Sequence, residues 1–188
     1  MKIVGIFAVV NLNLTAVKFK GNNTNEFRLL FENWQDPIYL YDFFEENKSD
    51  LQSGFFGNIT VDEAVEYTIQ EAEEMEAYIV KVAKTGTLDF RNTLHDLVFT
   101  PLHKNDYSVK LLPSKAYWRT RPSWLRLYAI EIDPIHYVVS GGAIKLTGSM
   151  NDRAHLKQEL IKLDVTDEYL KENELFTNDD LESFKISY

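Results

Sequence analysis

The sequence predicts an α+β protein in which an antiparallel sheet packs against helices. Two runs rich in β-branched and aromatic residues open the chain, over residues 2–10 and 13–20. Three further strand-like runs cover residues 107–118, 123–133 and 135–147, and helical patterns fill most of the chain between the two groups. A cluster of adjacent strands late in the chain favours antiparallel pairing, with the helices gathered on one side of the sheet.

Capping residues as well as apolar spacing indicate where the helices begin and end. Asp36-Pro37 combines an N-cap residue with proline at the first helical position. Thr60 and Glu63 have the spacing of a capping box, and they start a long helix that ends at Gly86. The predicted helices cover about residues 26–34, 37–51, 61–85, 89–98 and 151–173.

The last two strand-like runs, residues 123–133 and 135–147, form a predicted hairpin because Asp133-Pro134 has turn chemistry. Successive side chains of a strand point to opposite faces of the sheet. One face of the first strand is expected to carry Trp124, Arg126, Tyr128, Ile130 and Ile132, and the other face Leu125, Leu127, Ala129 and Glu131.

Gly141 and Gly142, in the second strand of this hairpin, invite a phosphate-loop interpretation. The spacing GxxxxGK[ST] is absent, and residues 143–147 alternate like a strand instead of starting a helix. The glycines are therefore predicted to bulge the strand or to let another backbone approach closely. Lys145 then points to the side opposite Leu146, which is expected to be buried.

The composition excludes several classes of function. The chain has 188 residues and no cysteine, so disulfides, thiol catalysis and thiolate metal sites are ruled out. Its four histidines form neither an HxxxH nor an HExxH pair, and we expect no metal and no other cofactor. No run approaches the roughly 18 apolar residues of a membrane helix, and the apolar start is typical of a strand. We expect a soluble protein of the cytoplasm that does not bind a membrane.

Charge is unevenly distributed along the chain, whose formal net charge is −9. Residues 1–100 hold 8 Lys/Arg against 16 Asp/Glu, residues 101–157 hold 9 against 4, and residues 158–188 hold 3 against 9. The middle segment therefore has a net charge of +5, between segments of −8 and −6. This pattern predicts either an anion-binding surface or a segment that pairs with acidic helices of its own fold.

Arg126 and Lys145 are cations that this segment places within apolar strands. Because the turn at Asp133 pairs the two strands, both cations are expected on neighbouring strands of one sheet. Such a pair can bind phosphate and stabilise the charge that develops in phosphoryl transfer. The alternative is that each cation neutralises a carboxylate, such as Glu131 or one on the long acidic helix.

The segment just before the hairpin interleaves aromatic residues with arginines. Aromatic residues interleaved with arginines can stack on single-stranded bases. The alternative is that these aromatic residues belong to the hydrophobic core. The aromatic residues are Tyr117, Trp118 and Trp124, and the arginines are Arg119, Arg121 and Arg126.

Residues 123–160, SWLRLYAIEIDPIHYVVSGGAIKLTGSMNDRAHLKQEL, resemble the RelE/HigB-like toxins of bacterial toxin–antitoxin systems, and the likeness extends over about residues 61–173. Arg126-Leu127-Tyr128 matches the family's strand with an arginine, a hydrophobic residue and a tyrosine. Residues 138–147 match the following apolar strand, which ends in a small residue, a lysine and a threonine. The segment LLPSKAYWRTRPSW is similar to the strand and loop that carry basic residues in the family.

The resemblance implies an endoribonuclease that cleaves mRNA on the ribosome without a metal ion, and whose protein partner is a cognate antitoxin. A base would activate the 2′-hydroxyl while arginine and lysine stabilise the charge on phosphorus. Arg126 would contact the phosphate, and Lys145 would be a second charge stabiliser or a proton-transfer group. Tyr128 and Arg153 are further catalytic candidates, and the substrate-binding candidates are Lys115, Arg119, Arg121 and Trp124.

The chain also departs from the family's pattern. Leu146 stands where a second lysine is usual, the net charge is negative, and the chain is longer. We expect a single domain over residues 1–173, with residues 1–60 added before the RelE-like core, and a loosely attached acidic tail at 174–188. The departures favour an alternative: a catalytically inactive interaction module on the same fold, which binds a protein partner.

Overall fold

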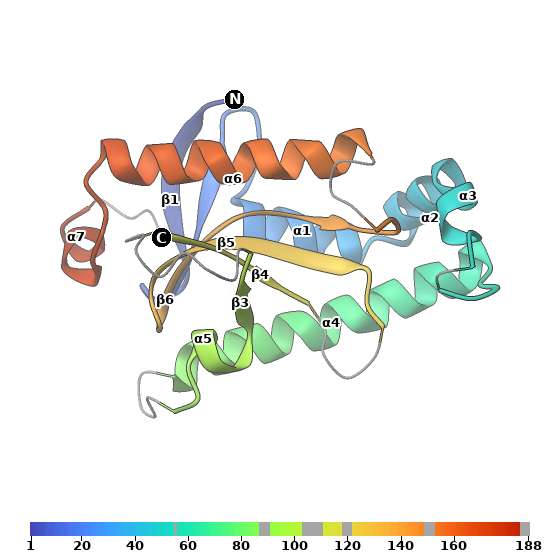
Figure 1. Ribbon diagram of the computed structural model, residues 1–188, viewed down its shortest axis with the longest axis horizontal. Helices are drawn as coiled ribbons and strands as arrows, with labels where there is room; N and C mark the ends of the chain where they lie inside the picture. Colours follow the sequence, from blue (N-terminus) through green and yellow to red (C-terminus); the bar gives the residue numbers. More distant parts are fainter. Residues whose placement is uncertain (55, 87–90, 103–110, 118–121, 149–152, 185–188) are drawn as a thin grey trace.

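One sheet lies between two layers of helices and forms the frame of the molecule. The computed structural model describes residues 1–54, 56–86, 91–102, 111–117, 122–148 and 153–184. In this part of the chain six strands form a single, mostly antiparallel sheet, so the predicted α+β class is confirmed. Figure 1 shows α6 (Ala154–Glu172) crossing one face of the sheet and α4 (Val61–Thr85) running along the other.

The strand order is β1-β2-β6-β5-β4-β3, and each neighbouring pair is antiparallel except β2 with β6. These two run parallel over three residue pairs, the last of which is Ala16 with Val139. Parallel neighbouring strands need a long connection between them. Here the connection is the chain between Phe19, the last residue of β2, and His136, the first residue of β6. The strands are β1 (Ile3–Val10), β2 (Leu14–Phe19), β3 (Phe99–Pro101), β4 (Leu112–Ala116), β5 (Leu125–Asp133) and β6 (His136–Ile144).

Helices cover both faces of the sheet, and the prediction that they gather on one side is wrong. Buried apolar side chains form an α4-side core, shared with α1 and α2, and a separate α6-side core, shared with α7. Both faces of β5 and β6 are buried, so a single helical layer would leave half of their apolar side chains in water. The other helices are α1 (Glu26–Trp34), α2 (Pro37–Glu46), α3 (Lys48–Leu51), α5 (Leu94–Leu97) and α7 (Asn178–Ser183).

The predicted hairpin of β5 and β6 is confirmed. Oδ1 of Asp133 accepts the backbone N–H groups of Ile135 and His136 at 2.9 and 3.0 Å, which closes the turn. The predicted alternation also holds along β5. Leu125, Leu127 and Ala129 belong to the α4-side core, whereas Tyr128, Ile130 and Ile132 belong to the α6-side core.

The long helix α4 begins and ends where its capping residues predict. The Thr60 hydroxyl accepts the backbone N–H of Glu63 at 3.2 Å, and the Glu63 carboxylate accepts the backbone N–H of Thr60 at 2.8 Å. Gly86 is the C-cap, with a helical φ of −62°. A Cβ at Gly86 would lie 3.1 Å from the carbonyl oxygen of Val82, so close packing favours glycine at this position.

The segment after α4 differs from its prediction. A helix was expected over about residues 89–98, of which 89–90 lie outside the described residues; the structure has the single turn α5, capped by Thr93. Residues 99–101 form the short edge strand β3, which pairs with β4. The predicted strand over 107–118 is present as β4, and its remaining residues are outside the described part except Leu111 and Tyr117.

The C-terminal segment is packed, not loosely attached as predicted. Residues 174–184 turn back from α6 and form α7, which begins with a capping box between Thr177 and Asp180. Leu175 and Leu181 are buried in the α6-side core. Burial of these two leucines anchors a segment whose acidic composition alone suggested a solvated tail.

The glycine pair of β6 lies where Glu159 of α6 reaches the strand. Oε2 of Glu159 accepts the backbone N–H of Gly142 at 2.7 Å. A Cβ at Gly141 would lie 2.1 Å from that oxygen, and a Cβ at Gly142 would lie 2.7 Å from the carbonyl oxygen of Arg126. The ladder with β5 also shifts register at Ser140. A bulge therefore lies next to the glycine pair, and the Arg126 backbone approaches Gly142 closely, as predicted; at Gly141 the approaching group is a side chain instead.

Glu159 belongs to a buried cluster of three charges. Lys162 donates to Glu26 at 2.8 Å and to Glu159 at 2.9 Å, and Asn22 donates to the other oxygen of Glu26. The exposed fractions of the Glu26, Glu159 and Lys162 side chains are 0%, 8% and 17%. Burial raises the pKa of Glu159 against the pull of Lys162. Burial alone would lower the pKa of Lys162, but the two carboxylates raise it above its usual value.

Gly141→Ala is expected to lower the free energy of unfolding by about 2–5 kcal/mol, because the new Cβ overpacks the contact and displaces the Glu159 hydrogen bond. Chemical denaturation measures this change. Gly148→Ala is the control, since a Cβ at Gly148 meets no atom within 4 Å. An equal, small effect of both substitutions would contradict the close packing at Gly141.

Lys162→Met leaves Glu26 and Glu159 buried together, and we expect it to cost about 3–5 kcal/mol at neutral pH. Burial raises the pKa of Glu159, and without Lys162 the folded variant binds a proton on this carboxylate more tightly than the unfolded chain, whose glutamate pKa is near 4.5. Its stability should therefore fall as pH rises above that value and recover as pH falls towards it. Denaturation at several pH values tests this; Lys171→Met, in a half-exposed ion pair, should cost less than about 1 kcal/mol throughout.

Candidate functional site

Arg126 is fixed in position by the backbone that precedes and begins β5. Its Nη1 donates to the carbonyl oxygens of Ser123 and Leu125 at 2.9 and 2.7 Å. The ring of Tyr117 lies against the guanidinium, with its centroid 5.0 Å away. Burial lowers the pKa of Arg126, although a guanidinium remains protonated in proteins. The result is a partly desolvated cation in a defined orientation, which suits an anionic ligand.

Lys145 lies just beyond β6 and on the same side of the sheet as Arg126. Its backbone N–H donates to the carbonyl oxygen of Trp124 at 2.7 Å, which extends the ladder by one residue. Ile144 and Leu146 belong to the α4-side core, so Lys145 points to the α6 side, as does Arg126. The Lys145 ammonium donates to the carbonyl oxygen of Gly148 at 2.7 Å.

The first turn of α6 lies beside this end of the hairpin. Nε2 of His155 is 3.2 Å from the carbonyl oxygen of Ile144, the last residue of β6. The first turn of α6 contains no acidic residue. The N-terminal end of a helix carries a partial positive charge, so α6 adds to the positive potential of Arg126 and Lys145.

Lys115 and Tyr117 of the β4 segment extend the same surface. Lys115 is the register partner of Tyr128, and directly paired residues project from the same face. Tyr117 lies two residues further on and is 38% exposed. We call Lys115, Tyr117, Arg126 and Lys145 the basic face; it combines three cations from β4, β5 and the end of β6 with one exposed aromatic ring.

Tyr128 lies beside the basic face but within the core. Its side chain is 2% exposed, and burial raises the pKa of its phenol, with opposing effects from Arg126 and Glu159. The phenol therefore keeps its proton at physiological pH. Tyr128 therefore lies near Arg126, as predicted, but it is buried in the core, where its ring packs against neighbouring side chains.

Arg153 and Trp124 are held elsewhere. Arg153 forms an ion pair with Asp50 of α3 through Nε and Nη2, which ties the start of α6 to the α2–α3 corner. Trp124 is 2% exposed in the α4-side core, and its ring nitrogen donates to Thr68 at 2.9 Å. Both the expected face of Trp124 and its expected role in base stacking are corrected. Arg119 and Arg121 lie outside the described residues.

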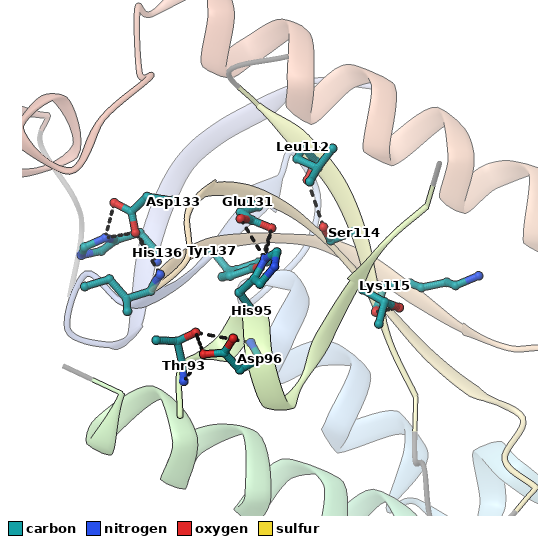
Figure 2. A network of polar contacts seen from close by, with 12 residues as sticks. Thr93, His95, Asp96, Leu112, Ser114, Lys115, Glu131, Asp133, His136 and Tyr137 are labelled. Carbon is teal, nitrogen blue, oxygen red and sulfur yellow. Dashed lines mark hydrogen bonds and ion pairs between the residues drawn. The ribbon is translucent and has the colours of Figure 1, made fainter. Parts of the chain in front are cut away.

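A second polar cluster, which the sequence did not reveal, lies at the turn end of the hairpin (Figure 2). Nδ1 of His95 is 3.1 Å from both carboxylate oxygens of Glu131, and the Tyr137 hydroxyl donates to Glu131 at 2.6 Å. The Tyr137 ring stacks on Phe99, with centroids 4.4 Å apart. The backbone N–H of His95 donates to the carbonyl oxygen of Pro134, which ties α5 to the turn.

Glu131 was the signal that could have revealed this cluster. Alternation placed its carboxylate among the apolar side chains of the α4-side face of β5, where a charge needs a partner. The partner comes from α5, a single turn whose position cannot be inferred from local sequence. Arg126 and Glu131 are five residues apart, or about 17 Å along a strand, and on opposite faces. Glu131 therefore does not neutralise Arg126, and its cluster is separate from the basic face. The other expected partner, a carboxylate on the long acidic helix, has support, because Glu71 of α4 acts to raise the pKa of Arg126.

Two wider properties of the described residues bear on function. None of their groupings of three or more His, Asp or Glu side chains could hold a metal ion. No helix among them is both long enough and apolar enough to cross a membrane.

Comparison of the chain with protein-family models, with curated proteins and with solved structures finds no match.

Substitution of the two aromatic residues beside Arg126 should have unequal effects. Trp124→Ala removes a fully buried ring and leaves Thr68 without its donor, so we expect a loss of about 3–5 kcal/mol in unfolding free energy. Tyr117→Ala, at an exposed position, should cost less than about 1 kcal/mol. Thermal or chemical unfolding of both variants checks this. A larger loss for Tyr117→Ala would reverse the assignment of core and surface.

Proposed function

We propose that the protein is a RelE/HigB-like toxin that cleaves mRNA at the ribosome without a metal ion, using the basic face. The observation that carries the proposal is that Arg126 and Lys145 project from one side of the β5–β6 hairpin, beside the start of α6. Arg126 is preorganised by two backbone carbonyl groups, and such fixed donors stabilise developing charge best. The resemblance of residues 123–160 to the family supports RNA cleavage as the reaction that these cations would serve.

In the proposed reaction the 2′-oxygen of one nucleotide attacks the adjacent phosphorus, and the bond from phosphorus to the 5′-oxygen breaks. The 2′-hydroxyl gives up a proton to a base, and the leaving 5′-oxygen gains one. Arg126 binds the non-bridging phosphate oxygens and stabilises their added negative charge. Lys145 provides a second positive charge or the proton for the leaving oxygen. Lys115 and the exposed ring of Tyr117 contact the neighbouring nucleotide.

Induced expression in a bacterial host tests this function. The wild type should arrest growth and cut cellular mRNA, whereas Arg126→Ala and Lys145→Ala should each slow cleavage about 10²–10³-fold, as loss of a charge-stabilising group does. Lys171→Ala is the control, because Lys171 lies in the last turn of α6. Far-ultraviolet circular dichroism should show that each variant folds. Normal growth and intact mRNA in cells that express the wild type would contradict the proposal.

A second candidate function is a non-cleaving interaction module on the same fold. It is favoured by the burial of Tyr128, by the ion pair that holds Arg153, and by Leu146, which is buried where the family usually has a second lysine. This candidate predicts that the purified protein binds a protein partner and does not cut RNA. Cleavage by the wild type that is lost in Arg126→Ala would exclude it.

A further inference from the structure

Exposed large apolar side chains are concentrated on helix α2. Eight large hydrophobic side chains are exposed in the described part of the chain, and three of them, Ile38, Tyr39 and Tyr41, lie within four residues of α2. Ile38 is 74% exposed and Tyr41 is 47% exposed. Residues three apart are neighbours on a helix surface, so these two form one outward patch.

The inner side of α2 shows that this outward patch is rigidly presented. Leu40 and Phe44 are fully buried, and the Phe44 ring contacts the Trp124 ring with centroids 5.6 Å apart. The Asp36 side chain caps the helix by accepting the backbone N–H groups of Ile38 and Tyr39. Packing therefore fixes which side of α2 faces the core, and Ile38 and Tyr41 are exposed because no part of the described fold covers them.

Acidic side chains surround the patch. Residues 36–51 contain five Asp or Glu residues and one lysine. Asp42, Glu45 and Glu46 are exposed on α2 itself, and Glu45 pairs with Lys48. An apolar centre with a charged rim is the usual composition of a protein interface, and tyrosine is among the residues that contribute most to binding.

We propose that the α2 patch, defined by Ile38 and Tyr41 with the rim Asp42, Glu45 and Glu46, docks a protein partner through a basic amphipathic helix. Its apolar side chains would contact Ile38 and Tyr41, and its lysines or arginines would face the acidic rim. A second copy of the chain fits poorly, since two acidic rims would meet and repel by roughly 1 kcal/mol per close pair in water. Nucleic acids and anionic lipids are repelled for the same reason.

The docking does not depend on the proposed function, because α2 lies outside residues 61–173, which carry the resemblance, and the α2 patch shares no residue with the basic face. It gives residues 1–60 a role: they supply a docking helix packed onto α4. RNA cleavage can therefore fail its own test while this docking is confirmed, and the reverse also holds.

A pair of designed peptides of roughly 20 residues, long enough to form a helix, tests the docking. Both carry leucine at helical spacing; one has lysine and the other glutamate at the remaining positions. Fluorescence anisotropy should show that the lysine peptide binds the full chain at least tenfold more tightly than the glutamate peptide. Its affinity should fall as salt is raised, because the rim charges are exposed. Equal affinities, or no binding of either peptide, would overturn the proposal.

Substitutions locate the binding. Ile38→Ser together with Tyr41→Ser should weaken binding of the lysine peptide at least tenfold, whereas Ile161→Ser, at a 49% exposed isoleucine of α6, should leave it unchanged. An equal effect of both changes would show general hydrophobic attraction and contradict the assignment. Light scattering provides a further test: a dimer of the wild type that the α2 substitutions abolish would identify a second copy as the occupant instead.

Discussion

The hydrogen bond from Gly142 to the Glu159 carboxylate is the contact on which the arrangement of the layers depends. It brings α6 so close to β6 that Gly141 must lack a side chain, while Leu30 and Trp34 of α1 crowd Gly142 from the other face. Lys162 then joins Glu159 to Glu26 at the start of α1. The β2–β6 ladder ends at Ala16 and Val139, just before the glycine pair, so charged groups replace backbone pairing where these strands part.

Local signals predicted the elements of the fold well, because their causes are local. The Thr60–Glu63 capping box and the Asp133 turn each involve residues at most three apart, and both were found where expected. The two-layered helix arrangement, β3 and the anchoring of 174–184 depend on contacts between distant segments. The glycine pair shows how far local sequence can predict structure. Its residues predicted a close approach, but the approaching group, Glu159, lies 17 residues from Gly142 and could not be identified locally.

For the candidate site too, features set by neighbouring residues were predictable and contacts between distant segments were not. The strand and turn patterns put Arg126 and Lys145 on neighbouring strands of one sheet, and the structure places them there and on the same side. The same rule failed for Trp124, which precedes β5 and therefore escapes its periodicity. The ion pair of Arg153 with Asp50 spans 103 residues, and the pairing of His95 with Glu131 spans 36, so neither could be read from neighbouring positions. Propensity and pattern carry no information on such partners.

How strongly the net charge of −9 opposes the proposed binding of RNA depends on where the acidic residues lie relative to the basic face. Helix α4 packs against the face of the sheet opposite Arg126, but the charge of Glu71 on α4 reaches the guanidinium and acts to raise its pKa. Glu71 therefore offsets part of the positive charge that Arg126 offers to an anion, because charges separated by protein interior are screened less than exposed ones. The exposed acidic residues of α6 lie from Asp164 onward, ten or more residues beyond Ala154. The acidic residues of α6 thus lie away from the basic face, and the overall charge is expected chiefly to slow the long-range approach of the proposed RNA.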